Sequence, residues 1–321
     1  MPHDNEFVKV LSIDGGGIRG IIPVMVLAEI EKKTGKRIAT MFDLMAGNSA
    51  GGIVTLGLNV KGQNGKPKFS ANKISDFFTK DGPVIFKKSL WKKFRSGFGI
   101  IDEKYDHEPL VTVLKTYMGE TKLKSSVTNT LISTYDIFNR HPQFFKSWSS
   151  SYSNHKMREI ARATSAAPTY FEPIKLKVKG KNAVLVDGGV FVNNPAVSAY
   201  AEAIRLQQEG KLPKKPILLV SLGTGELTRK ISYKEAKDWG LVEWVRPVLD
   251  VVFDGVSDAV DYQLDLILGK EKFYRFQTRL VEGFDDFDDA SNTNIKTLIR
   301  LAEALIAERQ ADIDKICQII K

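Results

Sequence analysis

Residues 8–20 read VKVLSIDGGGIRG, a stretch that joins three kinds of local structure. Val8 to Ile13 is a short apolar run rich in β-branched residues, which predicts a buried strand. This run meets Asp14 and three consecutive glycines, Gly15 to Gly17, which predict a tight turn. From Gly20 onward the apolar residues take helical spacing, at Ile22, Val26, Leu27 and Ile30. The stretch therefore predicts a strand, a glycine turn and a helix in direct succession.

The same alternation continues along the chain of 321 residues. Short apolar runs predict further strands at residues 41–46, 130–136, 183–186 and 216–222. Helical patterns occupy residues 51–58, 70–80, 156–165, 195–206, 241–268 and 292–320. Strands that alternate with helices favour an α/β fold with a mostly parallel central sheet flanked by helices. We expect one domain over residues 1–321, with the core motifs in 8–206 and the later strand and helices, 207–321, packed on it.

A serine between glycines follows the second predicted strand, in Gly47-Asn48-Ser49-Ala50-Gly51. A G-x-S-x-G pattern between an apolar strand and an apolar helix is typical of a nucleophile elbow. The small residues Gly47 and Gly51 would let this turn close while the Ser49 hydroxyl stays exposed. The alternative is a serine that only caps the following helix.

The glycine loop has two interpretations. Backbone N–H groups of Gly15, Gly16 and Gly17 can point at one place without obstruction, and beside a serine nucleophile they would form an oxyanion hole. Residues 15–20 also match G-x-G-x-x-G, the pattern of dinucleotide-binding folds. Those folds place an acid roughly 20 residues further on. Residues 35–40 contain no acid, and only Arg37 would suit an NADP-type site. An NAD(P)-binding module stays as the alternative.

The catalytic base is predicted from an absence of histidine. The chain has four histidines and the last is His155, so no histidine base follows in the order of the usual α/β-hydrolase triad. Asp187 ends an apolar strand and precedes Gly188 and Gly189, which give the backbone room. Alone, this pattern would suit an ordinary Asp-Gly turn. Together with Ser49 it predicts a Ser49–Asp187 dyad, in which a water-poor site raises the aspartate pKa from about 3.9.

These segments resemble the patatin-like phospholipase family, whose signatures are a DGGGxRG oxyanion loop, a GxSxG elbow and a DGG that carries the catalytic aspartate. The similarity extends to ATSAAPTYF (163–171), Asn193-Asn194-Pro195 and SLGTG (221–225), so that it covers about residues 8–270. The resemblance implies a fold related to the catalytic domain of cytosolic phospholipase A2. It also implies a calcium-independent lipid acyl hydrolase without metal or cofactor, in which Ser49 and Asp187 form the dyad.

The resemblance also bears on two residues beside the dyad. Arg19 matches the family arginine and would belong to the oxyanion loop, either by contact with phosphate or by support of the loop. Asn48 is a departure, because plant members usually carry threonine there. The departure concerns the fine shape of the elbow and leaves the nucleophile in place.

Composition suggests where the protein works. The formal net charge of +9 indicates an attraction to anionic partners. No apolar run reaches the roughly 18 to 20 residues that span a bilayer. The start of the chain does not read as a signal peptide, and the single Cys317 favours a reducing compartment. We therefore expect a cytoplasmic protein that is peripheral at the inner face of the membrane.

A basic and aromatic segment, residues 86–98, has three readings: it rests on an anionic membrane, binds a nucleotide effector, or is a solvated loop. Some bacterial members of the family are activated by cyclic dinucleotides. The resemblance therefore extends to a cyclic nucleotide effector and to a membrane-degrading role in antiviral defence against phage. Membrane phospholipids are the expected partners, a homo-oligomer is left open, and no nucleic acid polymer is expected.

The function predicted from these features is hydrolysis of carboxylic ester bonds in phospholipids or lysophospholipids, through an acyl-serine intermediate on Ser49. The alternatives are an NAD(P)-dependent protein and a non-catalytic lipid- or nucleotide-binding module that uses residues 15–20.

Overall fold

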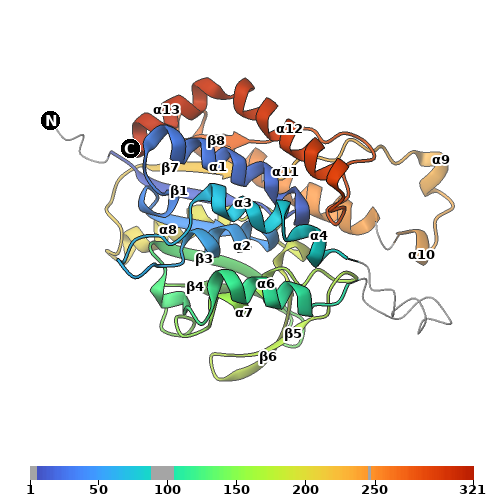
Figure 1. The fold of residues 1–321 in the computed structure, drawn as a ribbon, viewed down its shortest axis with the longest axis horizontal. Coiled ribbons are helices and arrows are strands. Elements are labelled where there is room, and N and C mark those ends of the chain that lie inside the picture. Colours follow the sequence, from blue (N-terminus) through green and yellow to red (C-terminus); the bar gives the residue numbers. More distant parts are fainter. Residues whose placement is uncertain (1–5, 88–104, 245–246) are drawn as a thin grey trace.

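Eight strands form one mixed sheet in the computed structural model, which describes residues 6–87, 105–244 and 247–321. The strands are β1 (Val8–Ile13), β2 (Leu44–Gly47), β3 (Asn129–Asp136), β4 (His141–Lys146), β5 (Ile174–Val178), β6 (Lys181–Asp187), β7 (Ile217–Leu222) and β8 (Phe273–Phe276). Their order is β5-β6-β3-β2-β1-β7-β8, and β4 pairs with β3 outside this path. Figure 1 shows the sheet in the middle of the molecule with helices around it.

The centre of the sheet is parallel, as the sequence predicts. β1 pairs in parallel with β2 and with β7, β2 with β3, and β7 with β8. Antiparallel pairs lie to one side, where β3 meets β4 and β6, and where β6 meets β5. Ile13, the last residue of β1, pairs with both Gly47 and Leu222. The glycine loop, the serine elbow and the loop after β7 therefore begin side by side at one edge of the sheet.

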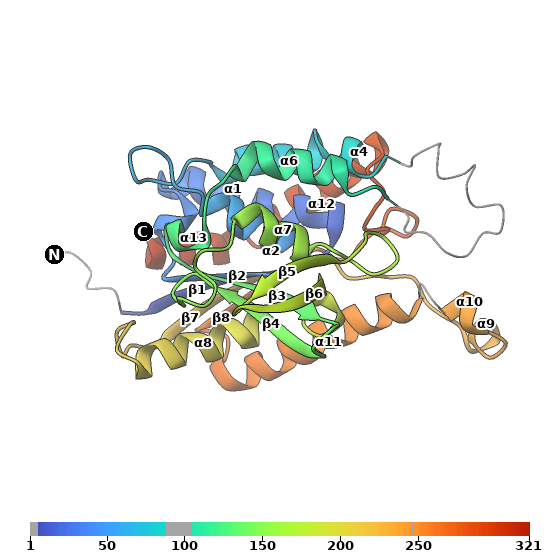
Figure 2. The same cartoon turned by 90° about the horizontal axis from the view of Figure 1, so that it is seen from below.

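Helices cover both faces of the sheet. They are α1 (Ile21–Thr34), α2 (Ser49–Leu58), α3 (Ala71–Thr79), α4 (Gly82–Ile85), α6 (Glu108–Met118), α7 (Met157–Thr164), α8 (Ala196–Gln208), α9 (Tyr233–Ala236), α10 (Leu241–Trp244), α11 (Pro247–Leu268), α12 (Asn292–Glu308) and α13 (Gln310–Ile320). Figure 2 shows α8 and α11 below the sheet, with α1, α2, α7 and α12 above it. None of the helices in the described ranges is both long and apolar enough to cross a membrane.

The sheet separates two apolar cores. Leu11 and Ile13 of β1 point into the larger core, where α1 and α2 pack, while Val8 and Val10 point into the smaller core beside α8. All four side chains are fully buried. Burial on both faces explains why β1 reads as a continuous apolar run instead of an alternating one.

Some predicted boundaries were wrong. The strand predicted at residues 41–46 begins only at Leu44 and extends to Gly47, and residues 41–43 connect it to a short 3-10 turn at Ile38–Thr40. Of the helix predicted at 241–268, the structure describes Leu241–Trp244 as α10 and Pro247–Leu268 as α11, and residues 245–246 lie outside the described residues. The helix predicted at 292–320 breaks at Arg309 into α12 and α13. Strands β4, β5 and β8 and helix α6 were not predicted.

Candidate active site

Ser49 occupies a strained turn between β2 and α2. The strand ends at Gly47, and Ser49 is the first helical residue with a φ of 50°, in the left-handed region that side chains other than glycine rarely adopt. A Cβ on Gly47 would lie 2.3 Å from the carbonyl oxygen of Gly51, and one on Gly51 would lie 2.2 Å from that of Ile13. The turn is therefore so tight that glycine is required on both sides of the serine.

Asp187 lies beside this turn and is buried, with 2% of its surface exposed. The Ser49 side chain is within hydrogen-bonding reach of the Asp187 carboxylate. Asp187 Oδ1 also accepts from the Gly189 N–H at 2.8 Å and from Asn48 Nδ2 at 3.1 Å. A Cβ on Gly188 would come within 2.4 Å of Asn48 Oδ1, so this glycine too is required by close packing. The structure thus brings together the two residues predicted as a dyad.

The environment of Asp187 favours its neutral form. Burial raises the pKa of Asp187 to about 6, against hydrogen bonds from Ser49, from the Gly189 N–H and from Asn48, which lower it. A carboxylate with a raised pKa is a better proton acceptor for a serine hydroxyl near neutral pH. The site is therefore suited to general base chemistry by Asp187.

A polar network behind the elbow was missed in the sequence. Thr164 at the end of α7 accepts the Ser49 N–H on its Oγ1 at 2.9 Å and donates to the Ser133 carbonyl oxygen at 2.7 Å. Ser133 of β3 in turn donates its hydroxyl to Asn48 Oδ1 at 2.8 Å. Thr164 lies in the ATSAAPTYF segment, which was part of the family resemblance, but the sequence did not indicate that Thr164 bonds to the elbow. These buried residues hold the elbow and the aspartate in a fixed relation.

The glycine loop lies against Ser49, since a Cβ on Gly15 would be 3.1 Å from Ser49 Cβ. The Gly15 N–H donates to the Asn193 carbonyl oxygen at 3.1 Å, and the Arg19 N–H donates to the Gly16 carbonyl oxygen at the same distance. Within the described residues, the N–H groups of Gly16 and Gly17 have no backbone acceptor. Of the predicted oxyanion donors, Gly15 and Arg19 thus have their N–H groups engaged, and Gly16 and Gly17 retain theirs.

Two contacts fix the shape of this loop. A Cβ on Gly16 would lie 2.2 Å from Thr224 Oγ1, and Thr224 donates its hydroxyl to the Gly15 carbonyl oxygen at 2.6 Å. Gly17 has a φ of 57°, and a Cβ there would lie 2.0 Å from the carbonyl oxygen of Phe287. The loop after β7, which carries Thr224, therefore supports the oxyanion loop from the neighbouring strand.

Arg19 lies at the border of the site and is 6% exposed. Its Nε donates to the Gly16 carbonyl oxygen at 3.3 Å, so its side chain closes the loop on itself. Burial lowers the pKa of Arg19, against the carboxylates of Asp254, Asp250, Asp285 and Asp286, which raise it. Arg19 also lines the same pocket as Ser49, where it supplies positive charge.

A buried ion-pair network holds the start of the loop. Arg275 of β8 donates from Nη2 to Asp14 Oδ2 at 2.7 Å and pairs through Nε with Asp261 of α11 at 2.8 Å. Asp261 also accepts from Asn194 at 2.8 Å. Burial raises the pKa of Asp14 to about 6, and the charge and hydrogen bond of Arg275 lower it. The first residue of the glycine loop is thereby tied to the last third of the chain.

An apolar pocket opens onto Ser49, Asp187, Gly16 and Gly17. Its other walls are mostly aliphatic and aromatic side chains, among them Ile53, Phe77, Phe78, Ile85, Leu110 and Phe171. A pocket of this composition accepts a hydrocarbon chain more readily than a polar ligand. Of the basic and aromatic segment predicted at 86–98, residues 88–98 lie outside the described residues. No group of three or more His, Cys, Asp or Glu side chains that could hold a metal ion occurs in the described ranges.

Comparison with known proteins gives the family. The model of the family described as patatin-like phospholipase matches residues 11–200, which include the glycine loop, Ser49 and Asp187. Patatin-like protein 2 of Oryza sativa subsp. japonica is 32% identical over 352 residues, which cover 98% of this chain and 87% of the relative. A Solanum tuberosum relative named "Probable inactive patatin-3-Kuras 1" is 33% identical and covers 94% of this chain and 87% of its own length.

Among solved structures, VipD from Legionella pneumophila is 11% identical with a TM-score of 0.38, over 93% of this chain and 67% of that chain. The strand, turn and helix around Ser49 define an α/β protein with a nucleophile elbow. The chain belongs to the patatin-like phospholipase family.

Proposed function

We propose that the protein is a lipid acyl hydrolase in which Ser49 and Asp187 cleave carboxylic ester bonds. The observation that carries the proposal is a buried aspartate with a raised pKa beside a serine on a strained elbow, both at an apolar pocket. A serine that only capped a helix would need neither the pocket nor the aspartate. The contact between the glycine loop and Ser49 supports an oxyanion role over dinucleotide binding.

The proposed reaction has two halves. Asp187 accepts the Ser49 proton as the serine oxygen attacks the ester carbonyl, and the N–H groups of Gly16 and Gly17 stabilise the resulting oxyanion. The carbon–oxygen bond to the alcohol then breaks, and the proton passes from Asp187 to the leaving alkoxide. Water attacks the acyl-serine by the reverse use of the same groups, which releases the fatty acid and restores Ser49.

We propose phospholipids or lysophospholipids as substrates. The apolar pocket suits the acyl chain, and Arg19 lies at the same pocket as a buried positive charge that suits the phosphate. The overall charge of +9 favours work at an anionic membrane surface. Both a phospholipase A and a lysophospholipase would release a free fatty acid. The two activities are distinguished by the second product, which is a lysophospholipid for the first and a deacylated glycerophosphate ester for the second.

The test is covalent labelling followed by lipid hydrolysis. A fluorophosphonate probe is expected to label the wild type and not Ser49→Ala, while Asp187→Asn folds normally and loses hydrolysis at least about a hundredfold. Full activity of Asp187→Asn would exclude the dyad. Because one relative carries "inactive" in its name, lipid hydrolysis itself must be measured. Running the assay with and without cyclic nucleotides also tests the activation that the family resemblance predicts.

A further inference from the structure

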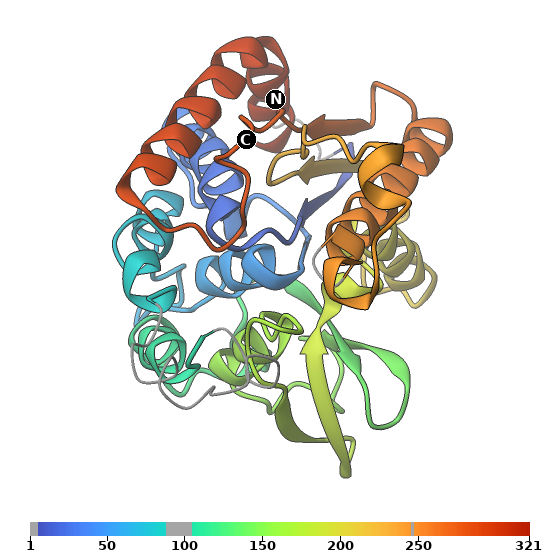
Figure 3. The same cartoon turned by 90° about the vertical axis from the view of Figure 1, so that its right-hand side faces the viewer.

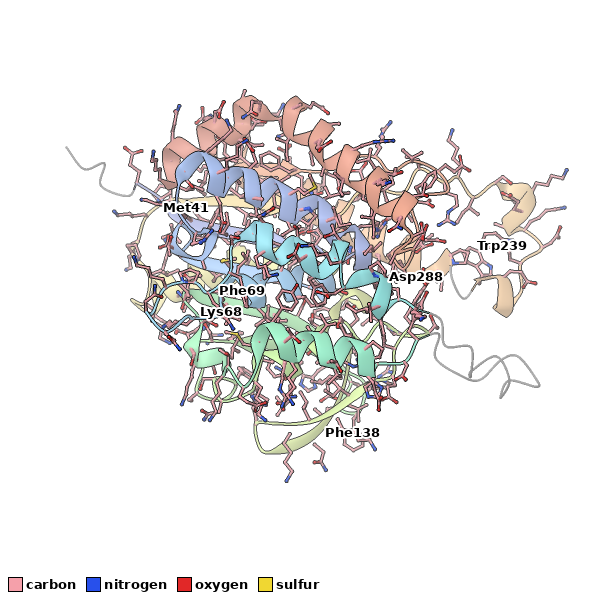
Figure 4. All side chains as sticks on the ribbon, viewed as in Figure 1. Met41, Lys68, Phe69, Phe138, Trp239 and Asp288 are labelled. Atoms are coloured by element: carbon pink, nitrogen blue, oxygen red, sulfur yellow. The ribbon has the colours of Figure 1, made fainter. Side chains whose placement is uncertain are left out.

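Exposed apolar side chains gather where α9, α10 and the first turns of α11 lie. They form the apolar tip, defined as Ile231, Tyr233, Trp244, Val248, Val251 and Val252. Tyr233 is 85% exposed and Val251 53%. Figures 1 and 2 show α9 and α10 projecting from the body, and Trp239, labelled in Figure 4, lies on this projection. A patch of exposed apolar side chains of this kind is typical of a surface that binds another molecule or a membrane.

The apolar tip adjoins the pocket that contains Ser49. Phe253 of α11 follows Val252 directly, and its side chain lines that pocket. On α4, Ile85 lines the pocket while its neighbour Val84 is 54% exposed. Figure 3 looks onto this end of the molecule, where the parallel strands finish. Whatever covers the apolar tip would therefore lie close to the route by which a substrate reaches Ser49.

The charges of the projection balance one another. Its acidic side chains are engaged within the projection, where Glu235 accepts from Ser232, Asp238 pairs with Lys237 at 3.6 Å, and Glu243 accepts from the Gly240 N–H. Lys230 and Lys234 are exposed and form no ion pair with the described residues. Residues 230–244 carry three lysines and three carboxylates, so the projection has no net charge.

Exposed aromatic and aliphatic residues beside a pocket that suits an acyl chain fit the boundary between phosphate groups and acyl chains in a bilayer. Trp239 and Trp244 pack edge to face with ring centroids 5.0 Å apart, so two further aromatic rings lie within the projection. We propose that the apolar tip inserts into the surface of a phospholipid bilayer and sets the pocket against it. This inference rests on the proposed function, because it names where that site meets its substrate.

Binding is tested apart from catalysis, with full-length Ser49→Ala protein and vesicles of phosphatidylglycerol and phosphatidylcholine. The variant Tyr233→Ser/Val248→Ser/Val251→Ser is expected to bind at least tenfold more weakly. The matched control, Tyr262→Ser/Leu266→Ser/Ile267→Ser, removes equally exposed residues from the far part of α11 and is expected to change binding less than twofold.

In the catalytically intact background, the tip variant should hydrolyse a soluble short-chain ester at the wild-type rate and vesicle lipid at least tenfold more slowly. Equal vesicle binding by tip and control variants would overturn the inference. So would a shift from dimer to monomer on gel filtration of the tip variant, which would make the tip a contact between copies. If the wild type cleaves no ester but Ser49→Ala binds vesicles through the tip, only the proposed function fails.

Discussion

Asp187 gives the site a pH dependence that follows from its burial. With a pKa of about 6, its carboxylate is protonated below that pH and is then unable to accept the Ser49 proton. We expect kcat/KM to rise about tenfold per pH unit below pH 6 and to level off above it. The measurement is kcat/KM for a soluble ester between pH 4.5 and pH 8.5, over the roughly four units that bracket this pKa. An acid limb centred near pH 4 would contradict the burial effect.

Asp14 also has a pKa of about 6, so either aspartate could cause the fall in activity at low pH. A substitution of Asn48 distinguishes the two. Asn48 Nδ2 donates to Asp187 and lowers its pKa, so Asn48→Ala should raise the pKa of Asp187 and move the limb to higher pH. We also expect a loss of activity of about ten- to a hundredfold at neutral pH, since the carboxylate loses its orientation. Asn59→Ala, a buried asparagine that does not touch the site, is the control and should leave the limb where it is.

The strained φ of Ser49 predicts that the proposed nucleophile is held at a cost in stability. A residue with a side chain in the left-handed region costs roughly 1–2 kcal/mol, and glycine avoids this cost. Glycine also gives the unfolded chain more conformational entropy, which offsets part of the benefit. We expect Ser49→Gly to have a free energy of unfolding about 1 kcal/mol higher than Ser49→Ala. Urea unfolding of both proteins measures the difference. Ala304→Gly, on the exposed side of α12, should instead lower the free energy by about 1 kcal/mol, and a Ser49→Gly protein no more stable than Ser49→Ala would argue against the strain.

At the scale of elements, Arg275 couples β8 and α11 to the loop after β1. Arg275→Met would leave the buried Asp14 carboxylate without its partner, and we expect a loss of about 3–5 kcal/mol in the free energy of unfolding at pH 8. Since the pKa of Asp14 would rise further, the carboxyl is protonated at pH 5 in the folded variant and the loss should be smaller there. Denaturant unfolding at both pH values measures this.

Two further substitutions make the effect of Arg275→Met interpretable. Arg275→Lys keeps the charge and should recover part of the stability. Arg205→Met removes an arginine whose side chain is 55% exposed and whose hydrogen-bonded partner, Glu209, is 33% exposed. That change should cost less than about 1 kcal/mol. An equal loss from Arg275→Met at pH 5 and pH 8 would mean that packing, and not the unpaired carboxylate, is responsible.

The central parallel strands were predicted because burial on both faces leaves a continuous apolar run, as in β1 and β7. The four-residue β8, which pairs in parallel with β7, was not predicted. β4 has only part of one face buried and begins with His141 and Pro142, so its sequence does not read as a strand. β5, Ile174–Val178, alternates apolar residues with lysine and did carry a period of two that would have identified it. The strands toward the sides of the sheet, β4 and β5 in antiparallel pairs and β8 in a parallel one, are thus the part of the fold that apolar runs did not reveal.

The candidate site divides in the same way. Ser49, Asp187 and the glycines lie in short contiguous motifs, so residue types and spacing were sufficient to single them out. Thr164 and Asn48 act through hydrogen bonds that depend on how α7, β3 and β6 sit in the sheet. The hydrogen bond from the Gly15 N–H to the Asn193 carbonyl oxygen likewise joins residues far apart in the sequence, so no local pattern predicts it. Their roles therefore needed the register of the strands.

On the scale of the whole molecule, the single sheet joins early and late parts of the chain. β1 lies between β2, which carries the elbow, and β7, whose loop supplies Thr224. The apolar tip also comes from the last third, although the pocket beside it is built mostly from earlier residues. The late segments thus contribute to the shape of the site and to the surface proposed to meet the membrane.

The bond between Asp14 and Arg275 bears on shortened relatives of this protein. The family model ends its match at residue 200, before β7, β8 and Arg275. A natural or cloned fragment that stopped after α8 would keep all three signature motifs. A search for these motifs alone would therefore count it as a complete member of the family. It would nevertheless expose the open edge of β1 and strip the buried carboxylate of its counter-charge. Such fragments should aggregate on expression, so possession of the three motifs is a poor criterion for counting working members in a genome.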